Sequence, residues 1–277
     1  MLVKEISKFG FDIVHGCQLR CVGCPNSTLK PKIKQILPAD FYQCLCNVDV
    51  AHVNLFRLFN FGEPLLHDKL PDILLQIPRQ TWTVKIVEIS TNAQYHDFDM
   101  MIEILKSGVI NRIAASCDGD GTAEDYERLR PPGKWEKFIE FLRRVHELRD
   151  MYAPNVVLIN RIVCTEPGAR ERWLGVVKPL GWTPEFREWL ILPGGGNMTG
   201  RQPVVPSRIC SYLSQPTVYA DYDGTVVPCC VHPRAGVLGN LMHNTLSEIL
   251  AGQARAKMLG AMQNNRMSMP ICGECEF

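Results

Sequence analysis

Three cysteines near the start of the chain have a spacing suited to metal binding. Cys17, Cys21 and Cys24 are separated by three and then two residues in HGCQLRCVGCPNS, so their thiolates can close over one small face. Three ligands suit an iron–sulfur cube in which the fourth iron keeps a free coordination position for chemistry. A structural zinc site needs a fourth ligand, for which His15 is a candidate. From these residues alone both metals remain open.

A second group of cysteines lies near the other end of the chain. Cys210, Cys229, Cys272 and Cys275 supply four thiolates, and Cys230 is adjacent to one of them. Four thiolates complete a structural zinc site, or they hold a four-iron cluster that has no vacant position. Such a cluster can pass electrons but cannot bind a substrate through iron.

The first motif follows a predicted strand, FGFDIVH, and resembles the signature of the radical S-adenosylmethionine (SAM) enzymes. The resemblance implies a 4Fe–4S cluster whose open iron chelates the amino and carboxylate groups of SAM. An electron from the cluster then cleaves SAM to a 5′-deoxyadenosyl radical, which abstracts a hydrogen from the substrate. In that family the residue before the third cysteine is usually aromatic and contacts adenine. Here it is Gly23, so another group must hold the adenine.

The second group resembles the SPASM/twitch modules of many radical SAM enzymes. The similarity lies in the segments GTVVPCC, LGNL and NTLSEIL as well as in the cysteines. It implies an auxiliary 4Fe–4S cluster, and the shortened cysteine set is similar to the single-cluster twitch form. The four residues between Gly224 and Cys229 favour Cys229 over Cys230 as the ligand.

The elements that must position these groups follow an alternating pattern. Segments rich in Val, Ile and Phe predict buried parallel strands at 10–16, 53–60, 84–90, 110–117, 156–164 and 185–191. Helical patterns fall between them near 38–47, 68–77, 97–107, 134–149 and 168–179. Six such units predict an α/β fold, a partial (β/α)6 TIM-like barrel over residues 1–192.

The remainder of the chain has a different composition. Residues 193–209 are rich in Gly and Pro, which predicts a linker. Residues 210–277 predict a small cysteine-rich module, in which a hairpin turning at Asp223 and Gly224 is followed by a helix. We therefore expect a barrel domain, a linker and an auxiliary cluster module.

Polar residues follow several predicted strands at the carboxyl-terminal rim, where barrels gather functional groups. The resemblance implies that seven of them bind SAM: Gly62, Glu63, Thr91, Asn92, Ser116, Asp118 and Asn160. Glu63 would accept a hydrogen bond from the amino group of SAM, while Ser116 and Asn160 fall where the family contacts its ribose or methionine moiety. Alternation along the strand turns Arg161 away from Asn160. Arg161 could pair with a carboxylate.

The composition is that of an ordinary globular protein. The 277 residues are 46% hydrophobic, and 30 basic residues face 29 acidic ones, so there is no strong nucleic-acid signal. No apolar run approaches the roughly 18 residues of a membrane span, and no signal region is evident, so we expect a cytoplasmic protein. Twelve cysteines are many for that compartment, and metal ligation is their natural use. Four outside both groups are expected to be small buried hydrophobes: Cys44, Cys46, Cys117 and Cys164.

These observations predict a radical SAM oxidoreductase similar in layout to the compact twitch dehydrogenases that oxidise an aminocyclitol alcohol. It would abstract a hydrogen from a small polar substrate of the sugar, cyclitol or nucleoside type and pass the second electron to the auxiliary cluster. A flavodoxin- or ferredoxin-type protein would supply the first electron. One alternative is a peptide- or protein-modifying maturase, which the lack of an N-terminal peptide-binding module disfavours. The others are a radical isomerase or decarboxylase with a structural auxiliary cluster, and a zinc-binding scaffold.

Overall fold

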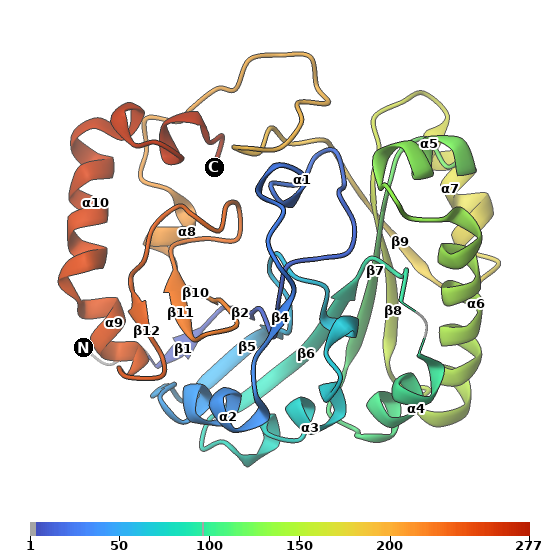
Figure 1. Cartoon of the computed structure of the whole chain (residues 1–277), viewed down its shortest axis with the longest axis horizontal. Coiled ribbons are helices and arrows are strands. Elements are labelled where there is room, and N and C mark those ends of the chain that lie inside the picture. The colour runs from blue at the N-terminus through green and yellow to red at the C-terminus, as the bar shows by residue number, and fades with distance from the viewer. Residues whose placement is uncertain (1–3, 96) are drawn as a thin grey trace.

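The computed structural model describes residues 4–95 and 97–277, whose strands form one long curved sheet and a small second one (Figure 1). The strands are β1 (Glu5–Ile6), β2 (Lys8–Phe11), β3 (Val14–His15), β4 (Lys34–Gln35), β5 (His52–Arg57), β6 (Thr83–Thr91), β7 (Arg112–Asp118), β8 (Val157–Val163), β9 (Thr183–Arg187), β10 (Thr217–Ala220), β11 (Thr225–Val227) and β12 (Gly239–Asn240). The helices are α1 (Asn26–Leu29), α2 (Pro38–Cys46), α3 (Leu70–Leu74), α4 (Phe98–Lys106), α5 (Ala123–Leu129), α6 (Trp135–Tyr152), α7 (Ala169–Val177), α8 (Ser211–Ser214), α9 (Leu246–Ala251) and α10 (Gln253–Asn265).

Six neighbouring strands of the sheet pair in parallel in the order β2-β5-β6-β7-β8-β9. A helix lies between each consecutive pair of these strands in the chain, which confirms the α/β architecture. The sheet is curved but does not close, because β9 is its last strand and β2 continues into β10 instead. Parallel strands joined this way bring their carboxyl ends to one rim.

The expected strand limits differ from the observed ones at both ends of this set. The first predicted strand is divided into β2 and β3, and between them the side chain of Asp12 binds the backbone of the loop at residues 60–62. The last strand, β9, ends at Arg187, before the limit expected at residue 191. The residues after it leave the sheet and line the main cavity instead.

The outer face of the sheet is packed with aromatic rings. Phe9 and Phe56 contact each other at 4.9 Å between ring centroids, and Phe11 meets Phe41 of α2 at 5.0 Å in an edge arrangement. All four rings are fully buried. Because side chains alternate along a strand, residues between these aromatics face the concave side, where the functional groups lie.

Helix α6 shows why the predicted helices form. Its buried positions recur at three- and four-residue spacing: Phe138, Phe141, Leu142, Val145 and Leu148. This stripe faces the sheet and α4, while the opposite side carries exposed charges. The indole of Trp182 donates a 2.8 Å hydrogen bond to the Leu142 carbonyl and ties α6 to the segment before β9.

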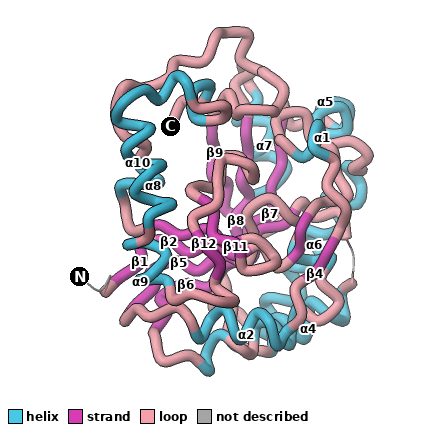
Figure 2. The backbone as a smooth tube through the Cα atoms, turned by 60° about the vertical axis from the view of Figure 1, so that its left-hand side comes forward, coloured by secondary structure: helices cyan, strands magenta, loops and turns pink. Residues whose placement is uncertain are grey.

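The C-terminal strands extend the barrel sheet (Figure 2). The predicted hairpin is present: β10 and β11 pair in antiparallel fashion, and the turn contains Gly224 at φ +79°. Strand β10 also pairs in parallel with β2. The helical region that follows is split into α9 and α10 at Gly252, whose backbone is extended.

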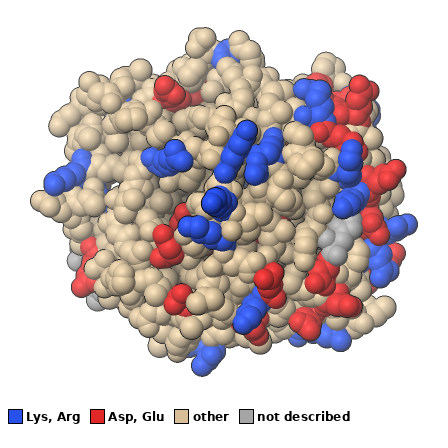
Figure 3. All heavy atoms as spheres, in the orientation of Figure 1, with Lys and Arg blue, Asp and Glu red and all other residues tan. Residues whose placement is uncertain are grey.

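The surface carries charges of both signs. In Figure 3 the basic side chains form a loose group over the region of α1 and β4, and acidic and basic side chains alternate towards α6. No helix within residues 4–95 and 97–277 has the length and apolar character needed to cross a membrane. Cys44, Cys117 and Cys164 are buried as expected, but Cys46 is exposed because it lies on the solvent side of the last turn of α2.

Candidate active site

The cysteine loop that follows β3 covers the concave face of the sheet. Cys17, Cys21 and Cys24 line one cavity of about 450 Å³ together with the carboxyl ends of the parallel strands. Six of the seven residues predicted to bind SAM line the same cavity: Gly62, Glu63, Thr91, Asn92, Ser116 and Asp118. The structure therefore brings most of the predicted site together from distant parts of the chain.

The structure places Asn160 on the other face of β8. Its side-chain nitrogen donates a 2.9 Å hydrogen bond to the Ala115 carbonyl, and its oxygen accepts from the Cys117 thiol at 3.4 Å. It is fully buried there. Arg161, one residue later, is among the residues that line the cavity. Alternation along the strand thus gives the cavity Arg161 instead of Asn160.

One of the three thiols is held by an amide at the end of β6. Asn92 Nδ2 donates to Cys17 Sγ at 3.2 Å, and the Asn92 and Gln18 amides pair reciprocally at 3.1 and 3.2 Å. An N–H donor at a sulfur stabilises the thiolate and is one of the means by which proteins set the potential of a bound cluster.

Glu63 is a buried carboxylate at the cavity wall. Its Oε2 accepts from the Asn92 backbone N–H at 2.7 Å, and its Oε1 accepts from the Leu65 N–H at 3.2 Å. Burial raises the pKa of Glu63 to about 7, although these hydrogen bonds oppose the shift. Each carboxylate oxygen has a second lone pair, so Glu63 can accept one more hydrogen bond from a ligand.

Sequence reasoning missed Asp12, which fixes the loop carrying Glu63. Its buried carboxylate accepts hydrogen bonds from the backbone N–H groups of Asn60, Phe61 and Gly62, at 2.5, 2.7 and 2.9 Å. A Cβ at Gly62 would lie 1.6 Å from the Val14 carbonyl oxygen, so this loop can approach β3 only through a glycine. The sequence signal was an acidic residue inside a predicted hydrophobic strand, FGFDIVH.

An aromatic ring from the end of the barrel fills the space beside Gly23. A Cβ at Gly23 would lie 2.9 Å from Cζ3 of Trp189. Trp189 lines the cavity, is 9% exposed and has its indole nitrogen buried without a hydrogen-bond partner. The missing side chain at position 23 therefore makes room for a ring supplied from 166 residues further along the chain.

The triple glycine after the barrel packs against the same cysteine loop. Gly196 N donates to the Val22 carbonyl at 2.7 Å, and Thr28 Oγ1 donates to the Gly194 carbonyl at 2.9 Å. A Cβ at Gly195 would lie 2.6 Å from the Gly23 carbonyl oxygen. Within the predicted linker these glycines thus let two backbones touch.

Charged groups surround the buried thiols. Arg130 Nη1 donates to Asp118 Oδ2 at 2.7 Å, and both side chains line the cavity. Burial raises the pKa of the Cys17 thiol to about 11 and of the Cys21 thiol to about 12, and Arg130 opposes the shift at Cys21. Bound cations favour the thiolate form, so metal binding there would release protons.

The second thiol group gathers near the C-terminus of the chain. Cys229 and Cys275 pack together with Val231. Burial raises the pKa of Cys229, Cys272 and Cys275, and the nearby Cys210 thiol adds to the shift of each, as Cys230 does for Cys229.

A single arginine organises the backbone around these C-terminal cysteines. The buried Arg266 donates to the carbonyl of Cys272 at 3.1 Å, to that of Cys275 at 2.8 Å and to that of Phe277. It also reaches the carbonyls of Pro206 and Arg208 at 3.4 and 3.3 Å. Nothing in the sequence pattern marked this residue, because its partners are backbone atoms.

Cys230 belongs to the main cavity and not to the C-terminal group. It is half-buried, lines the cavity with Cys17, and lies beside the hydroxyl groups of Tyr212 and Tyr219, whose pKa values are raised by burial and by this thiol. The adjacent Cys229 packs in one cluster with Cys275 and does not line the cavity.

The donor chemistry of both thiol groups suits iron–sulfur clusters, which proteins hold mainly through thiolates. Across residues 4–95 and 97–277, no three His, Cys, Asp or Glu side chains are already grouped closely enough to hold a metal ion. His15, the extra ligand of the zinc alternative, has its Nδ1 3.2 Å from Asp221 Oδ1. The ligand assignments therefore rest on residue type and placement.

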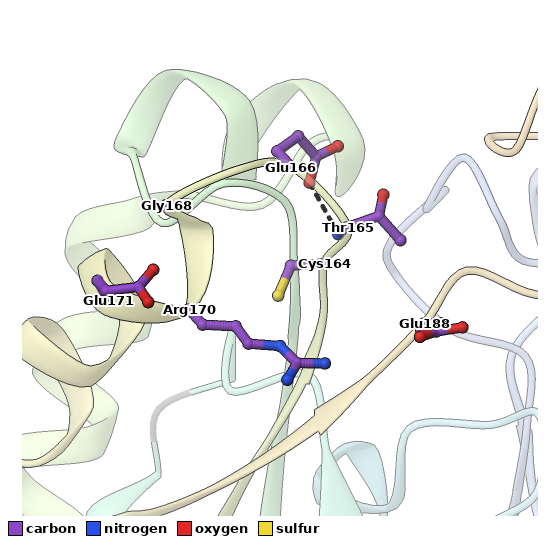
Figure 4. A pocket seen from close by; sticks show the side chains of 7 residues that line it. All are labelled: Cys164, Thr165, Glu166, Gly168, Arg170, Glu171 and Glu188. Carbon is purple, nitrogen blue, oxygen red and sulfur yellow. Dashed lines mark hydrogen bonds between the residues drawn. The ribbon is translucent and has the colours of Figure 1, made fainter.

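A second hollow of about 330 Å³ lies beside the carboxyl end of β8 (Figure 4). It is lined by Cys164, Glu166, Arg170 and Glu188 among others, and the Thr165 N–H donates to Glu166 Oε2 at 3.1 Å. Glu188 also lines the main cavity, so the two spaces adjoin. None of the predicted site residues lines this hollow.

Two family models match the chain. Residues 12–160 match the radical SAM superfamily, and residues 210–276 match SPASM, an iron–sulfur cluster-binding domain. This chain belongs to the radical SAM superfamily. Membership implies a 4Fe–4S cluster and SAM, and the SPASM match implies auxiliary iron–sulfur binding. A radical SAM enzyme needs a reductant and a substrate.

Solved structures show the same fold. BtrN in complex with AdoMet and 2-DOIA is similar at a TM-score of 0.62 and 17% identity, covering 100% of this chain and 95% of BtrN. AnSMEcpe with bound AdoMet is similar at a TM-score of 0.65 and 13% identity, and the match covers 97% of this chain and 89% of anSMEcpe. AnSMEcpe with AdoMet and the Cp18Cys peptide has a TM-score of 0.65 and 15% identity, and the match covers 98% of this chain and 88% of anSMEcpe. No curated protein matches this radical SAM chain.

Proposed function

We propose that this radical SAM enzyme is a dehydrogenase acting on a small polar molecule. The observation that carries the proposal is the second thiol group, set apart from the main cavity, in a chain that matches BtrN over nearly the whole length of both. BtrN was solved with AdoMet and 2-DOIA, which supports a comparable substrate class here. The cavity of about 450 Å³ is within the size range of small-molecule sites.

The residue types and the placement of the thiols support two ligand sets. Cys17, Cys21 and Cys24 would hold the cluster that faces the cavity, and a second set would hold the auxiliary cluster: Cys210, Cys229, Cys272 and Cys275. When bound, the first cluster supplies the electron that cleaves SAM, and the second accepts the electron released by substrate oxidation. Four thiolates leave no position for a substrate on the second cluster, which supports an electron-accepting role.

The protein's own groups bind and orient SAM. The free lone pairs of Glu63 suit the N–H donors of the SAM amino group, and Asp12 holds the loop that carries Glu63. Trp189 occupies the place beside Gly23 where an aromatic contact to adenine is expected. Ser116, Thr91 and Asp118 line the remaining wall, where they can receive the hydroxyl groups of the ribose.

A peptide-modifying reaction is the second candidate. AnSMEcpe, solved with AdoMet and the Cp18Cys peptide, has a slightly higher TM-score than BtrN. The two candidates differ in the size of the substrate and not in the chemistry of the first cluster. We therefore assay sugar, cyclitol and nucleoside candidates beside short peptides.

The test uses anaerobically reconstituted enzyme with SAM, a flavodoxin- or ferredoxin-type donor and each substrate class. We expect one 5′-deoxyadenosine per oxidised product, without regeneration of SAM. The Cys272→Ala/Cys275→Ala variant is expected to keep 5′-deoxyadenosine formation and to lose the oxidised product. Oxidised product from that variant would exclude the auxiliary group as electron acceptor, and regeneration of SAM would instead identify an isomerase.

A further inference from the structure

A row of residues crosses the concave face of the sheet next to the cavity. Strand register places Tyr219, Gly10, Arg57, Glu88 and Arg112 side by side on β10, β2, β5, β6 and β7. Registered neighbours share one face, and Tyr219 and Arg57 line the main cavity. A Cβ at Gly10 would lie 2.9 Å from Cδ1 of Tyr219, so the glycine leaves the space that this ring occupies.

Positive charge exceeds negative charge around Glu88. Its fully buried carboxylate lies 3.0 Å from Arg57 Nε, 3.1 Å from Arg112 Nη1 and 2.7 Å from Arg161 Nη2. Although burial opposes it, these guanidinium groups hold the pKa of Glu88 below its usual range. A single carboxylate is therefore the shared ion-pair partner of three guanidinium groups.

A second carboxylate does not restore the balance. Glu185 lies 3.5 Å from Arg161 Nε and accepts a 2.9 Å hydrogen bond from Arg187 Nε. Four guanidinium groups thus share two carboxylates, and the half-buried Lys8 is close enough that burial and Arg57 lower its pKa. An excess of partly buried positive charge is unfavourable unless an anion accompanies it. Glu188 also lines the cavity, and both it and Arg187 are solvent-exposed and screened by water, so the buried excess consists of Arg57, Arg112 and Arg161.

One buried hydrogen-bond donor at the same cavity lacks a partner. Trp189 is 9% exposed, and its indole nitrogen has no hydrogen-bond partner within the described residues. The Tyr219 hydroxyl is also buried and lies beside the Cys230 thiol, which is a weak acceptor. Buried donors are normally satisfied, so the indole indicates that a ligand supplies an acceptor atom.

We propose that Arg57, Arg161 and Arg187, here called the arginine cluster, bind an anionic group of the substrate, a carboxylate or a phosphate. The inference rests on the proposed function and narrows its substrate class from polar to acidic small molecules. Guanidinium groups match the paired oxygens of both anions, and Tyr219 can donate to a further oxygen. The resemblance assigns the amino and carboxylate groups of SAM to the open iron, with Glu63 accepting a hydrogen bond from the amino group, which leaves the arginine cluster to the substrate.

The test measures binding and not turnover. Reconstituted enzyme with SAM present is titrated calorimetrically with inorganic phosphate and, separately, with acetate, and the tighter of the two identifies the group recognised. Arg187→Gln is the principal variant, because its side chain is 47% exposed and its loss leaves the contacts of Glu88 intact. We expect it to weaken anion binding by about tenfold or more. Arg187→Lys retains the positive charge and is expected to keep most of the affinity.

Arg143→Gln is the matched control, because Arg143 is exposed on α6 and its substitution removes the same charge at a place away from the cavity. It is expected to bind both anions like the unmodified enzyme. The proposal is overturned if neither anion binds at millimolar concentration, or if Arg187→Gln binds as tightly as the control. Iron content and SAM affinity are measured on every variant. If the unmodified enzyme holds no iron or does not bind SAM, the proposed function is contradicted. If it holds iron and binds SAM but binds neither anion, only this inference is contradicted.

Discussion

Single residues in this chain act by leaving space as much as by contributing groups. At Gly62 the absence of a side chain lets the loop after β5 lie against the Val14 carbonyl, and Asp12 then holds that loop by three backbone N–H groups. The position of Glu63 in the cavity wall depends on both. Gly62 and Asp12 thus affect the site by fixing the position of the loop that carries Glu63.

Gly62→Ala tests this dependence. The added Cβ would meet the Val14 oxygen at 1.6 Å, so the loop must move away and lose bonds to Asp12. We expect the free energy of unfolding to fall by about 1–3 kcal/mol, together with a loss of SAM affinity, as measured by denaturant titration and equilibrium binding. Gly175→Ala in α7 is the control: a Cβ there meets nothing within 4 Å, and we expect a gain of about 0.5–1 kcal/mol. Equal effects of the two substitutions would contradict the steric argument.

The pKa of Glu63 predicts how SAM binding varies with pH. Burial raises this pKa to about 7, so the carboxylate is protonated below that pH and is a weaker hydrogen-bond acceptor for the amino group of SAM. SAM affinity should therefore be constant above about pH 8 and fall as the pH decreases through 7, by up to about tenfold at pH 6. Equilibrium binding between pH 6 and 8 measures this, and Glu63→Gln should bind weakly with a flat profile. A flat profile for the unmodified enzyme would remove Glu63 from this role.

Much of the site could be predicted from the sequence, because its residues follow hydrophobic strands at one rim. Glu63, Asn92 and Ser116 were placed in this way, and all three line the cavity. Strand alternation excludes Asn160 from it, which could be decided only once the register of β8 against β7 was known. Trp189 could not be predicted, because it reaches the cavity through a segment that leaves the sheet.

At the scale of elements, short connections hold the two thiol groups in place. The Gly194–Gly196 segment binds the cysteine loop through backbone atoms, and Arg266 joins the 3₁₀ turn at Cys272–Glu274 to residues 206–208. The sequence predicted a linker for 193–209 from its Gly and Pro content. Composition could not reveal these contacts, because they involve main-chain groups that any residue possesses.

Arg266→Met is expected to damage the C-terminal group selectively. The substitution keeps much of the side-chain volume but leaves the carbonyls of Cys272 and Cys275 without their donor. We expect iron to fall from about eight to about four atoms per chain, because one of two four-iron clusters is lost, while SAM binding is retained. Iron analysis and calorimetry provide the measurements. Lys257→Ala, an exposed position on α10, is the control, and an unchanged iron content in Arg266→Met would refute the role assigned to this arginine.

At the scale of the whole molecule, the barrel and the C-terminal strands share one sheet. The pairing of β10 with β2 means that the two parts recognised as separate families are joined by a backbone ladder. A sequence pattern shows strands but not which edge they join, so this continuity could be learned only from the structure. It also brings Tyr219 to the row that contains Arg57.

Hydrogen exchange tests this continuity. We expect the amides of β10 (Thr217–Ala220) to exchange as slowly as those of β2 (Lys8–Phe11), because both belong to one ladder, as measured by mass spectrometry after timed deuteration. The connector at 197–208 has no regular hydrogen-bond ladder within the described chain and should exchange fast. If β10 exchanged at the rate of the connector, the shared sheet would be wrong.

The ring beside Gly23 has an evolutionary consequence. Two positions 166 residues apart occupy one volume, so a bulky group can be present at only one of them at a time. Homologous chains with a phenylalanine or tyrosine before the third cysteine should carry a small side chain at position 189. In this chain, the double substitution Gly23→Phe/Trp189→Gly should restore the SAM binding that either substitution alone removes.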